Sequence, residues 1–136
     1  MNSTNTTNTV NSRVILSMGG KCGVGKTSVM VSLVEWFDGN GIPAQLLDLD
    51  TENKARGSLS HFYGERTPKV NIHTPAGLDA FVDYISEGAP VIIADMGAGA
   101  GQITADWFDN IALWSANPCS KFIHHSDALL FFCCAE

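Results

Sequence analysis

The chain is organised around the run Gly20-Lys21-Cys22-Gly23-Val24-Gly25-Lys26-Thr27. An apolar run of strand length, residues 13–18, precedes it, and from Lys26 onward apolar residues recur at spacings of three and four. Glycines between a strand and a helix allow the backbone to turn tightly. The pattern therefore predicts a strand, a turn and a helix over residues 13–37, with Gly39-Asn40-Gly41 ending the helix.

This run matches every position of the pattern G-x-x-x-x-G-K-[ST], which is typical of phosphate-binding loops. Backbone N–H groups of such a loop point at a phosphate, and the positive end of the following helix adds to the attraction. We expect Lys26 to reach the β- and γ-phosphates of a nucleotide, and the Thr27 hydroxyl to bind Mg²⁺. An accidental glycine-rich turn is the alternative. The predicted nucleotide-binding residues are Gly20, Lys21, Cys22, Gly23, Val24, Gly25, Lys26, Thr27 and Ser28.

Outward from the loop, apolar runs alternate with helical patterns. Further strands are predicted over residues 44–50, 89–95 and 127–134, with a short edge strand over 70–72. Further helices are predicted over 55–62, 75–85 and 102–114, the second opened by Thr74-Pro75 and closed by Gly88. Strands that are apolar throughout are typically covered on both faces. The predicted fold class is α/β: a largely parallel sheet with helices on both faces, as in an incomplete P-loop NTPase.

Acidic residues close two of the predicted strands. Asp48 and Asp50 end the run 44–50, and Asp95 ends the run 89–95. In an open parallel sheet, ligands bind beyond the carboxyl ends of the strands. A carboxylate there is costly to bury unless a cation is nearby, and Mg²⁺ would supply one. Each acid alone could be a solvated strand end, but together with the loop they predict a site for Mg²⁺ and a nucleotide.

Because of its extra lysine, Lys21-Cys22-Gly23-Val24-Gly25-Lys26-Thr27 resembles the deviant Walker A motif K-G-G-x-G-K-[ST] of the ParA/MinD ATPases. Cys22 stands where that family usually has glycine. Leu46-Leu47-Asp48-Leu49-Asp50 resembles the family's second motif, and Val91–Asp95 is similar to its Walker B strand, without the proline that usually follows. The resemblance extends from about Arg13 to Asp109.

The resemblance implies binding of ATP with Mg²⁺ and hydrolysis of the ATP. Lys26 and Lys21 would stabilise the transferred phosphoryl group, Lys21 from across a dimer interface, and Asp50 would orient the attacking water. The implied catalytic residues are Lys21, Lys26 and Asp50. The implied magnesium site consists of Thr27, Asp48 and Asp95, with the two acids acting through water.

The resemblance also implies a cellular switch. Its members form nucleotide-dependent homodimers, so a homodimer is expected here, along with a partner protein that activates hydrolysis. A weaker similarity, in Asp48-Leu49-Asp50 with Asn53 and in the glycine-rich segment Asp95-Met96-Gly97-Ala98, is to transfer-associated ATPases of conjugative plasmids. Plasmid or DNA partition, plasmid transfer and protein positioning all remain open as cellular roles.

Composition excludes several other classes of protein. With 14 Asp and Glu against 8 Lys and Arg, the net charge is −6, which does not support DNA contact through a basic face. No apolar run approaches the roughly 20 residues of a membrane-spanning helix, and the N-terminus does not resemble a secretory signal. The four cysteines lack metal-ligand spacing and indicate reduced thiols, so we expect a cytoplasmic location.

Residues 1–12 are expected to form a disordered tail, and residues 13–136 a P-loop nucleotide-binding domain that is the N-terminal half of a larger fold. In such a truncated fold, residues 128–134 would form an uncovered apolar edge strand. His124-His125 are expected to be surface or loop residues. Trp107-Phe108 and Trp114 are expected to be packing residues, and Trp36 a core or interface residue. A redox-sensing thiol at Cys22 is a minor alternative.

Three other functions stay open at this point. A related P-loop synthetase would use the loop to activate a carboxylate, and an iron–sulfur reductase component would need bridging cysteines. A nucleotide-binding fragment without turnover is the third. The extra Lys21 favours the ATPase switch over the synthetase.

Overall fold

A computed structural model of the chain describes residues 12–18, 25–51, 57–87, 89–97, 121–125 and 128–135. Its five strands form one sheet in the order β2-β3-β1-β5-β4. The strands are β1 (Ser12–Met18), β2 (Ala44–Asp48), β3 (Val91–Asp95), β4 (Lys121–His125) and β5 (Ala128–Ala135). The helices are α1 (Lys26–Gly39), α2 (Leu59–Tyr63) and α3 (Pro75–Ser86), and the 3₁₀ turn η1 (Gly64–Arg66) follows α2 directly.

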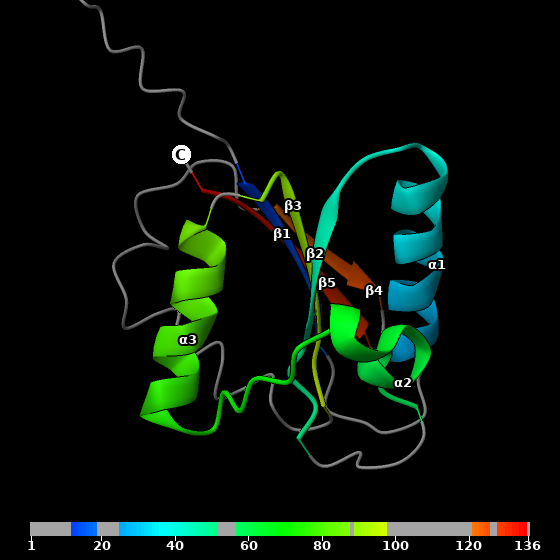
Figure 1. The fold of residues 1–136 in the computed structure, drawn as a ribbon. Coiled ribbons are helices and arrows are strands. Elements are labelled where there is room, and N and C mark those ends of the chain that lie inside the picture. The colour runs from blue at the N-terminus through cyan, green and yellow to red at the C-terminus, as the bar shows by residue number, and fades with distance from the viewer. Residues whose placement is uncertain are drawn as a thin grey trace, which may run out of the picture.

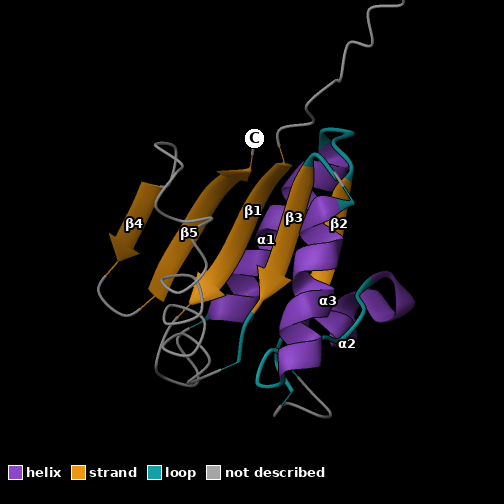
Figure 2. Ribbon diagram, turned by 90° about the vertical axis from the view of Figure 1, so that its left-hand side faces the viewer, coloured by secondary structure: helices purple, strands orange, loops and turns teal. Residues whose placement is uncertain are grey.

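The connections between the parallel strands put helices on both faces of the sheet. From β1 to β2 the chain moves two strand positions in one direction, and from β2 to β3 it moves one position back. Because such crossovers are almost always right-handed, opposite directions of travel place their helices on opposite faces. Figure 1 shows α1 and α3 on the two sides of the sheet, and Figure 2 shows α3 in front of it. The predicted α/β class with helices on both faces is therefore confirmed.

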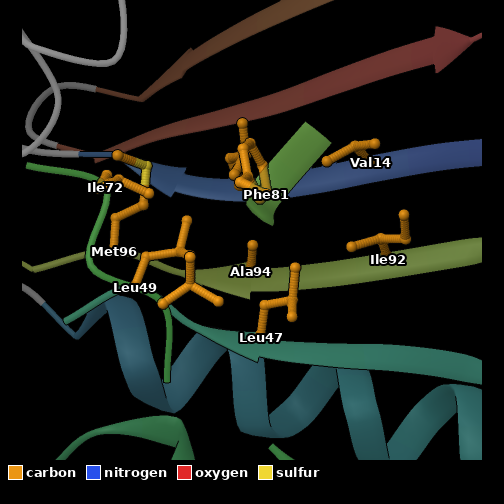
Figure 3. Close-up of a cluster of buried hydrophobic side chains, with 10 residues drawn as sticks. Val14, Leu47, Leu49, Ile72, Phe81, Ile92, Ala94 and Met96 are labelled. Carbon is orange, nitrogen blue, oxygen red and sulfur yellow. The ribbon is translucent and has the colours of Figure 1, made fainter. Parts of the chain in front are cut away.

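Each face of the sheet has its own apolar core. The core under α3 contains Phe81 of that helix together with Val14, Leu16, Leu47, Ile92 and Ala94 of the strands, and it continues into the residues that follow the strands (Figure 3). The core under α1 contains Met30 and Val34 packed on Ile15, Leu46, Val91 and Ile93. Neighbouring residues of one strand point to opposite faces, so strands that are apolar throughout can serve both cores.

Helix α1 ends in the arrangement that its sequence predicts. Gly41 has a φ of 66°, and its N–H bonds to the carbonyl of Asp38. The N–H of Ile42 bonds to the carbonyl of Phe37, which completes a Schellman motif, and both of these side chains pack in the core under α1. The helix therefore stops at Gly39 and turns the chain directly into β2.

Side-chain contacts fasten α2 and η1 to the outer surface of α1. The Tyr63 hydroxyl donates to a Glu35 carboxylate oxygen at 2.8 Å. Arg66 donates two hydrogen bonds to the Asp38 carboxylate, at 2.6 and 2.7 Å, and its guanidinium lies 5.7 Å from the centre of the Tyr63 ring. Burial and the bond to Glu35 raise the pKa of Tyr63 to about 12, so this hydroxyl remains a donor at neutral pH. The contacts hold α2 and η1 against α1.

The sheet is less parallel than predicted. Strands β2, β3 and β1 are parallel, but β5 runs antiparallel to β1, and β4 runs antiparallel to β5. Only residues 126–127 separate β4 from β5, and a connection this short joins neighbouring strands as an antiparallel hairpin. The prediction of a largely parallel sheet therefore holds for three of the five strands.

The same hairpin corrects two local predictions. Residues 128–134 do form a strand, but β5 lies between β1 and β4 and is not an edge strand. His124 and His125, predicted as surface or loop residues, lie in strand β4, which had not been predicted, so the loop alternative is wrong and the surface alternative stays a prediction. The five residues of β4 are too few and too mixed in polarity to predict a strand by themselves, and pairing with β5 supplies what the local pattern does not.

Other element boundaries differ modestly. The described part of the predicted helix 55–62 becomes helical only at Leu59, and the edge strand predicted at 70–72 is replaced by one isolated bridge between Lys69 and Asp48. Helix α3 opens as predicted, because Thr74 caps it with a hydrogen bond from the Gly77 N–H. The helix predicted at 102–114 and the glycine expected to close α3, Gly88, lie outside the described residues.

Candidate functional site

The carboxyl ends of the three parallel strands bring the predicted acids to one edge of the sheet. Asp48 and Asp95 are direct neighbours in the register of β2 and β3. The N–H of Leu49 bonds to the Asp95 carbonyl at 2.8 Å, so the two strands remain joined as far as the acids. Helix α1 starts at this edge, after Gly25, whose φ of 86° suits the turn into the helix. The edge thus combines a helix N-terminus with buried carboxylates.

Asp95 is the central residue of this site. Its side chain is buried, and its two carboxylate oxygens accept hydrogen bonds from two hydroxyls, Ser17 at 2.8 Å and Thr27 at 2.7 Å. Ser17 also accepts a bond from the backbone N–H of Met96 at 2.9 Å. One carboxylate therefore connects the end of β1, the first turn of α1 and the end of β3.

The electrostatic environment of Asp95 disfavours its charge. Burial raises the pKa of this carboxyl above its ordinary value of 3.8, and the negative charges of Asp48 and Asp50 raise it further. The hydrogen bonds from Thr27 and Ser17 act in the opposite direction and lower the pKa. Burial has the largest effect, so the pKa of Asp95 is raised on balance. A cation bound beside this carboxylate would favour its charged form.

Asp48 is completely buried and has partners on both carboxylate oxygens. One oxygen accepts from the Asp50 N–H at 3.0 Å. The other accepts from the Ser60 N–H at 3.1 Å and lies 3.5 Å from the Lys69 ammonium nitrogen. Asp48 therefore joins the end of β2 to the start of α2 and to the segment around Lys69.

Asp50 lies just beyond β2, with 8% of its surface exposed. Its carboxylate lies close to Gly97, because a Cβ built on that glycine would be 2.8 Å from an Asp50 Oδ1. Gly97 follows β3 by two residues, so the carboxylate of Asp50 lies beside the chain that leaves Asp95. The structure thus brings Asp48, Asp50 and Asp95 together, as the strand ends predict.

Several predicted residues are not placed. Gly20, Lys21, Cys22, Gly23 and Val24 lie outside the described residues, and so does Asn53. Lys26 is the first residue of α1 and is half-buried, whereas Ser28 is exposed. The roles predicted for all of these residues stay predictions.

Sequence reasoning overlooked two residues that lie beside the acids, Ser17 and Lys69. Ser17 carries a detectable signal, since it is a hydroxyl near the end of an otherwise apolar strand. Lys69 carries none, because it becomes relevant only when its segment is placed beside Asp48. Gly97 belongs to the glycine-rich run after Asp95, which the sequence does single out, but its place beside Asp50 follows only from the structure. Such contacts depend on strand order, which local patterns do not encode.

The donor set can be tested against Mg²⁺. Within the described residues, no three His, Cys, Asp or Glu side chains are grouped so as to hold a metal ion together. Mg²⁺ in nucleotide sites does not need such a cage, because it takes one or two protein oxygens and completes its shell with water and phosphate. The Thr27 hydroxyl and the Asp95 carboxylate, 2.7 Å apart and both hard oxygen donors, fit that requirement.

Comparisons with protein-family models, with curated proteins and with solved structures find no match to this chain. Among the described helices, none combines the length and apolar character needed to cross a membrane.

Proposed function

We propose that this chain is a switch that binds ATP with Mg²⁺ and hydrolyses it in the manner of the ParA/MinD ATPases. One observation carries the proposal: Thr27, the last residue of the phosphate-loop motif, donates a 2.7 Å hydrogen bond to Asp95 at the end of a neighbouring parallel strand. The loop motif and the acid come from separate parts of the sequence, and the fold joins the two side chains that would share a magnesium ion.

The residues near this contact would divide the work. The N-terminus of α1 and Lys26 would bind the phosphates, since the positive end of a helix attracts anions and the lysine carries a positive charge. Thr27 would bind Mg²⁺ directly, and Asp95 through water. The bound ion would neutralise charge that develops on the phosphates. Asp50, placed beside Gly97, would orient the water that attacks the γ-phosphate.

The wider roles rest on the resemblance of the loop motif. We propose that the chain acts in the cytoplasm as a nucleotide-dependent homodimer, with Lys21 reaching the nucleotide of the partner and a partner protein activating hydrolysis. DNA partition, plasmid transfer and protein positioning are the proposed settings. Release of the dimer on hydrolysis would make the protein a timed switch.

Two substitutions test this function. Lys26→Ala is expected to abolish ATP binding, because the phosphates lose their main cation. Asp50→Ala is expected to bind ATP but not hydrolyse it, and therefore to accumulate as a dimer. Fluorescent-nucleotide binding, phosphate release and size-exclusion chromatography in ATP and Mg²⁺ measure these outcomes. Asp83→Ala, an exposed acid on α3, is the control and should leave all three unchanged.

Each result has a clear reading. An Asp50→Ala protein that stays monomeric in ATP and Mg²⁺ would rule out the dimer switch. Binding without phosphate release by the unaltered chain would favour a nucleotide-binding chain without turnover. Phosphate release only in the presence of an added carboxylate substrate would favour a related P-loop synthetase.

A further inference from the structure

We infer that Asp48 is a buried anchor and not a magnesium ligand: paired with Lys69, it holds Asp50 in position for hydrolysis. This assignment rests on the proposed ATPase function, and it departs from the role that the motif resemblance implies for Asp48. It also gives Lys69, which no sequence motif contains, a positioning role in the site.

The first argument is that protein donors already compensate the carboxylate of Asp48. Its side chain is 0% exposed, and its two oxygens together have three partners: the N–H groups of Asp50 and Ser60 and the Lys69 ammonium. This carboxylate therefore does not need a metal ion to balance its charge, and a magnesium-bound water would compete with these donors. By contrast, the partners of Asp95 are two side-chain hydroxyls, one of which belongs to the phosphate-loop motif.

The second argument is that the backbone brings Lys69 to Asp48 from both sides. The Asp48 N–H bonds to the Pro68 carbonyl at 3.0 Å, and the Val70 N–H bonds to the Asp48 carbonyl at 2.9 Å. These bonds make the parallel bridge between Asp48 and Lys69. The ammonium nitrogen then lies 3.5 Å from the Asp48 carboxylate, which compensates a charge that would be costly to bury alone.

The third argument is that the pair fixes the backbone of Asp50. Its N–H donates to Asp48, and its carbonyl accepts from the Lys69 ammonium at 3.2 Å. Both polar groups of this peptide segment are therefore held, and the carboxylate is directed toward Gly97. A small displacement of a group that orients a reacting water is enough to lower the rate greatly. Lys69 thus acts through Asp48 and Asp50, without touching the substrate.

A magnesium titration separates the two acids. Binding of a fluorescent ATP analogue is measured against Mg²⁺ concentration for the unaltered chain, Asp48→Asn and Asp95→Asn. We expect Asp95→Asn to raise the half-saturating Mg²⁺ concentration by about tenfold or more. Asp48→Asn is expected to leave it unchanged, because its amide oxygen can still accept a backbone bond. An equal shift in both variants would overturn the assignment of Asp48.

A thermal-unfolding cycle tests the pairing with Lys69. Lys69→Met should lower the melting temperature because it leaves the buried charge of Asp48 without its cation. Lys69→Arg keeps a cation there and should retain most of the stability of the unaltered chain. The double variant Asp48→Asn/Lys69→Met should be more stable than Lys69→Met alone, since no buried charge is left unpaired. The control is Arg66→Met. It removes a cation of similar exposure, 41% against 43%, whose partner Asp38 is 40% exposed and not buried, and it should change stability little.

Turnover decides whether the pair positions Asp50. Lys69→Met is expected to lower kcat about tenfold or more while leaving KM for ATP unchanged, and Arg66→Met to change neither. Independent, additive effects of Asp48→Asn and Lys69→Met on kcat would overturn the proposal. Failure of the unaltered chain to bind ATP with Mg²⁺, or to release phosphate from it, would instead overturn the proposed function, and the thermal cycle would still decide whether Asp48 and Lys69 act as a pair.

Discussion

Hydroxyl groups give Asp95 its position. Ser17 contributes one of them and is itself held by the Met96 N–H, so it has a defined orientation before any ligand binds. Thr27 contributes the other from the first turn of α1. If Mg²⁺ binds as proposed, Thr27 would exchange this partner for the ion while Ser17 would keep the carboxylate in place. The contact from Ser17 is thus fixed in advance, whereas the contact from Thr27 can change.

Gly97 leaves room for the carboxylate of Asp50, and Gly97→Ala should remove that room. The added Cβ would lie 2.8 Å from Asp50 Oδ1, so the carboxylate must rotate away. We expect ATP binding to persist and kcat to fall roughly ten- to a hundredfold, because the water-orienting group is displaced. Steady-state phosphate release measures the effect.

The matched control is Gly39→Ala at the end of α1, where an added Cβ has no atom within 4 Å. It should keep the kcat of the unaltered chain. If Gly97→Ala also keeps it, Asp50 does not orient the attacking water from its observed position.

At the scale of elements, the helices of the two crossovers have different roles. Helix α1 presents its N-terminus to the acids and covers one core, whereas α3 covers the other core and contributes no residue to the site. The start of α3 is nevertheless well fastened. Thr74 accepts from the Gly77 N–H at 3.1 Å and donates to the Asn71 carbonyl at 2.9 Å.

Loss of this cap should affect stability without affecting the site. Thr74→Ala is expected to lower the free energy of unfolding by about 1 kcal/mol, because the first turn of α3 loses a side-chain acceptor. Thr74→Ser keeps the hydroxyl and should cost much less. Urea denaturation of both variants measures the difference, and nucleotide binding should be unchanged in each. Equal stability of the two variants would mean that the hydroxyl does not cap the helix.

At the scale of the whole molecule, the buried carboxylate of Asp95 destabilises the native state when it is charged. The pKa of Asp95 is raised mainly by burial, so the native state binds this proton more tightly than the unfolded chain does. The free energy of unfolding should therefore fall as pH rises from the ordinary value of 3.8 through the raised pKa. Below 3.8 the carboxyl is protonated in both states, and the penalty disappears.

Asp95→Asn should remove this penalty. Without Mg²⁺, we expect the variant to be more stable than the unaltered chain at neutral pH, by a margin that shrinks as the pH is lowered. Urea denaturation across that pH range measures the margin, and Asp83→Asn is a control because its carboxyl is exposed. A margin that does not change with pH would show that the charge of Asp95 is not the cause.

Local patterns predicted much of this molecule. The helix from Lys26 to the Gly39-Asn40-Gly41 turn, the capped start of α3 and the acids at the ends of two strands all follow from signals within a few residues of one another. Periodicity, helix caps and left-handed glycines depend on residues that are close in the sequence, so they can be predicted from the sequence alone. The α/β class follows in the same way from the alternation of buried strands and helices.

Strand order and side-chain partners came only from the tertiary structure. The antiparallel hairpin β4–β5 beside β1 depends on pairing, and a run of apolar residues does not specify its direction. The bond from Ser17 to Asp95 joins residues 78 positions apart, and Lys69 meets Asp48 across 21 positions (69 − 48). The order of the strands decides which distant residues lie beside a buried carboxylate. Their hydrogen bonds and ion pairs contribute strongly to stability only because the carboxylate is buried.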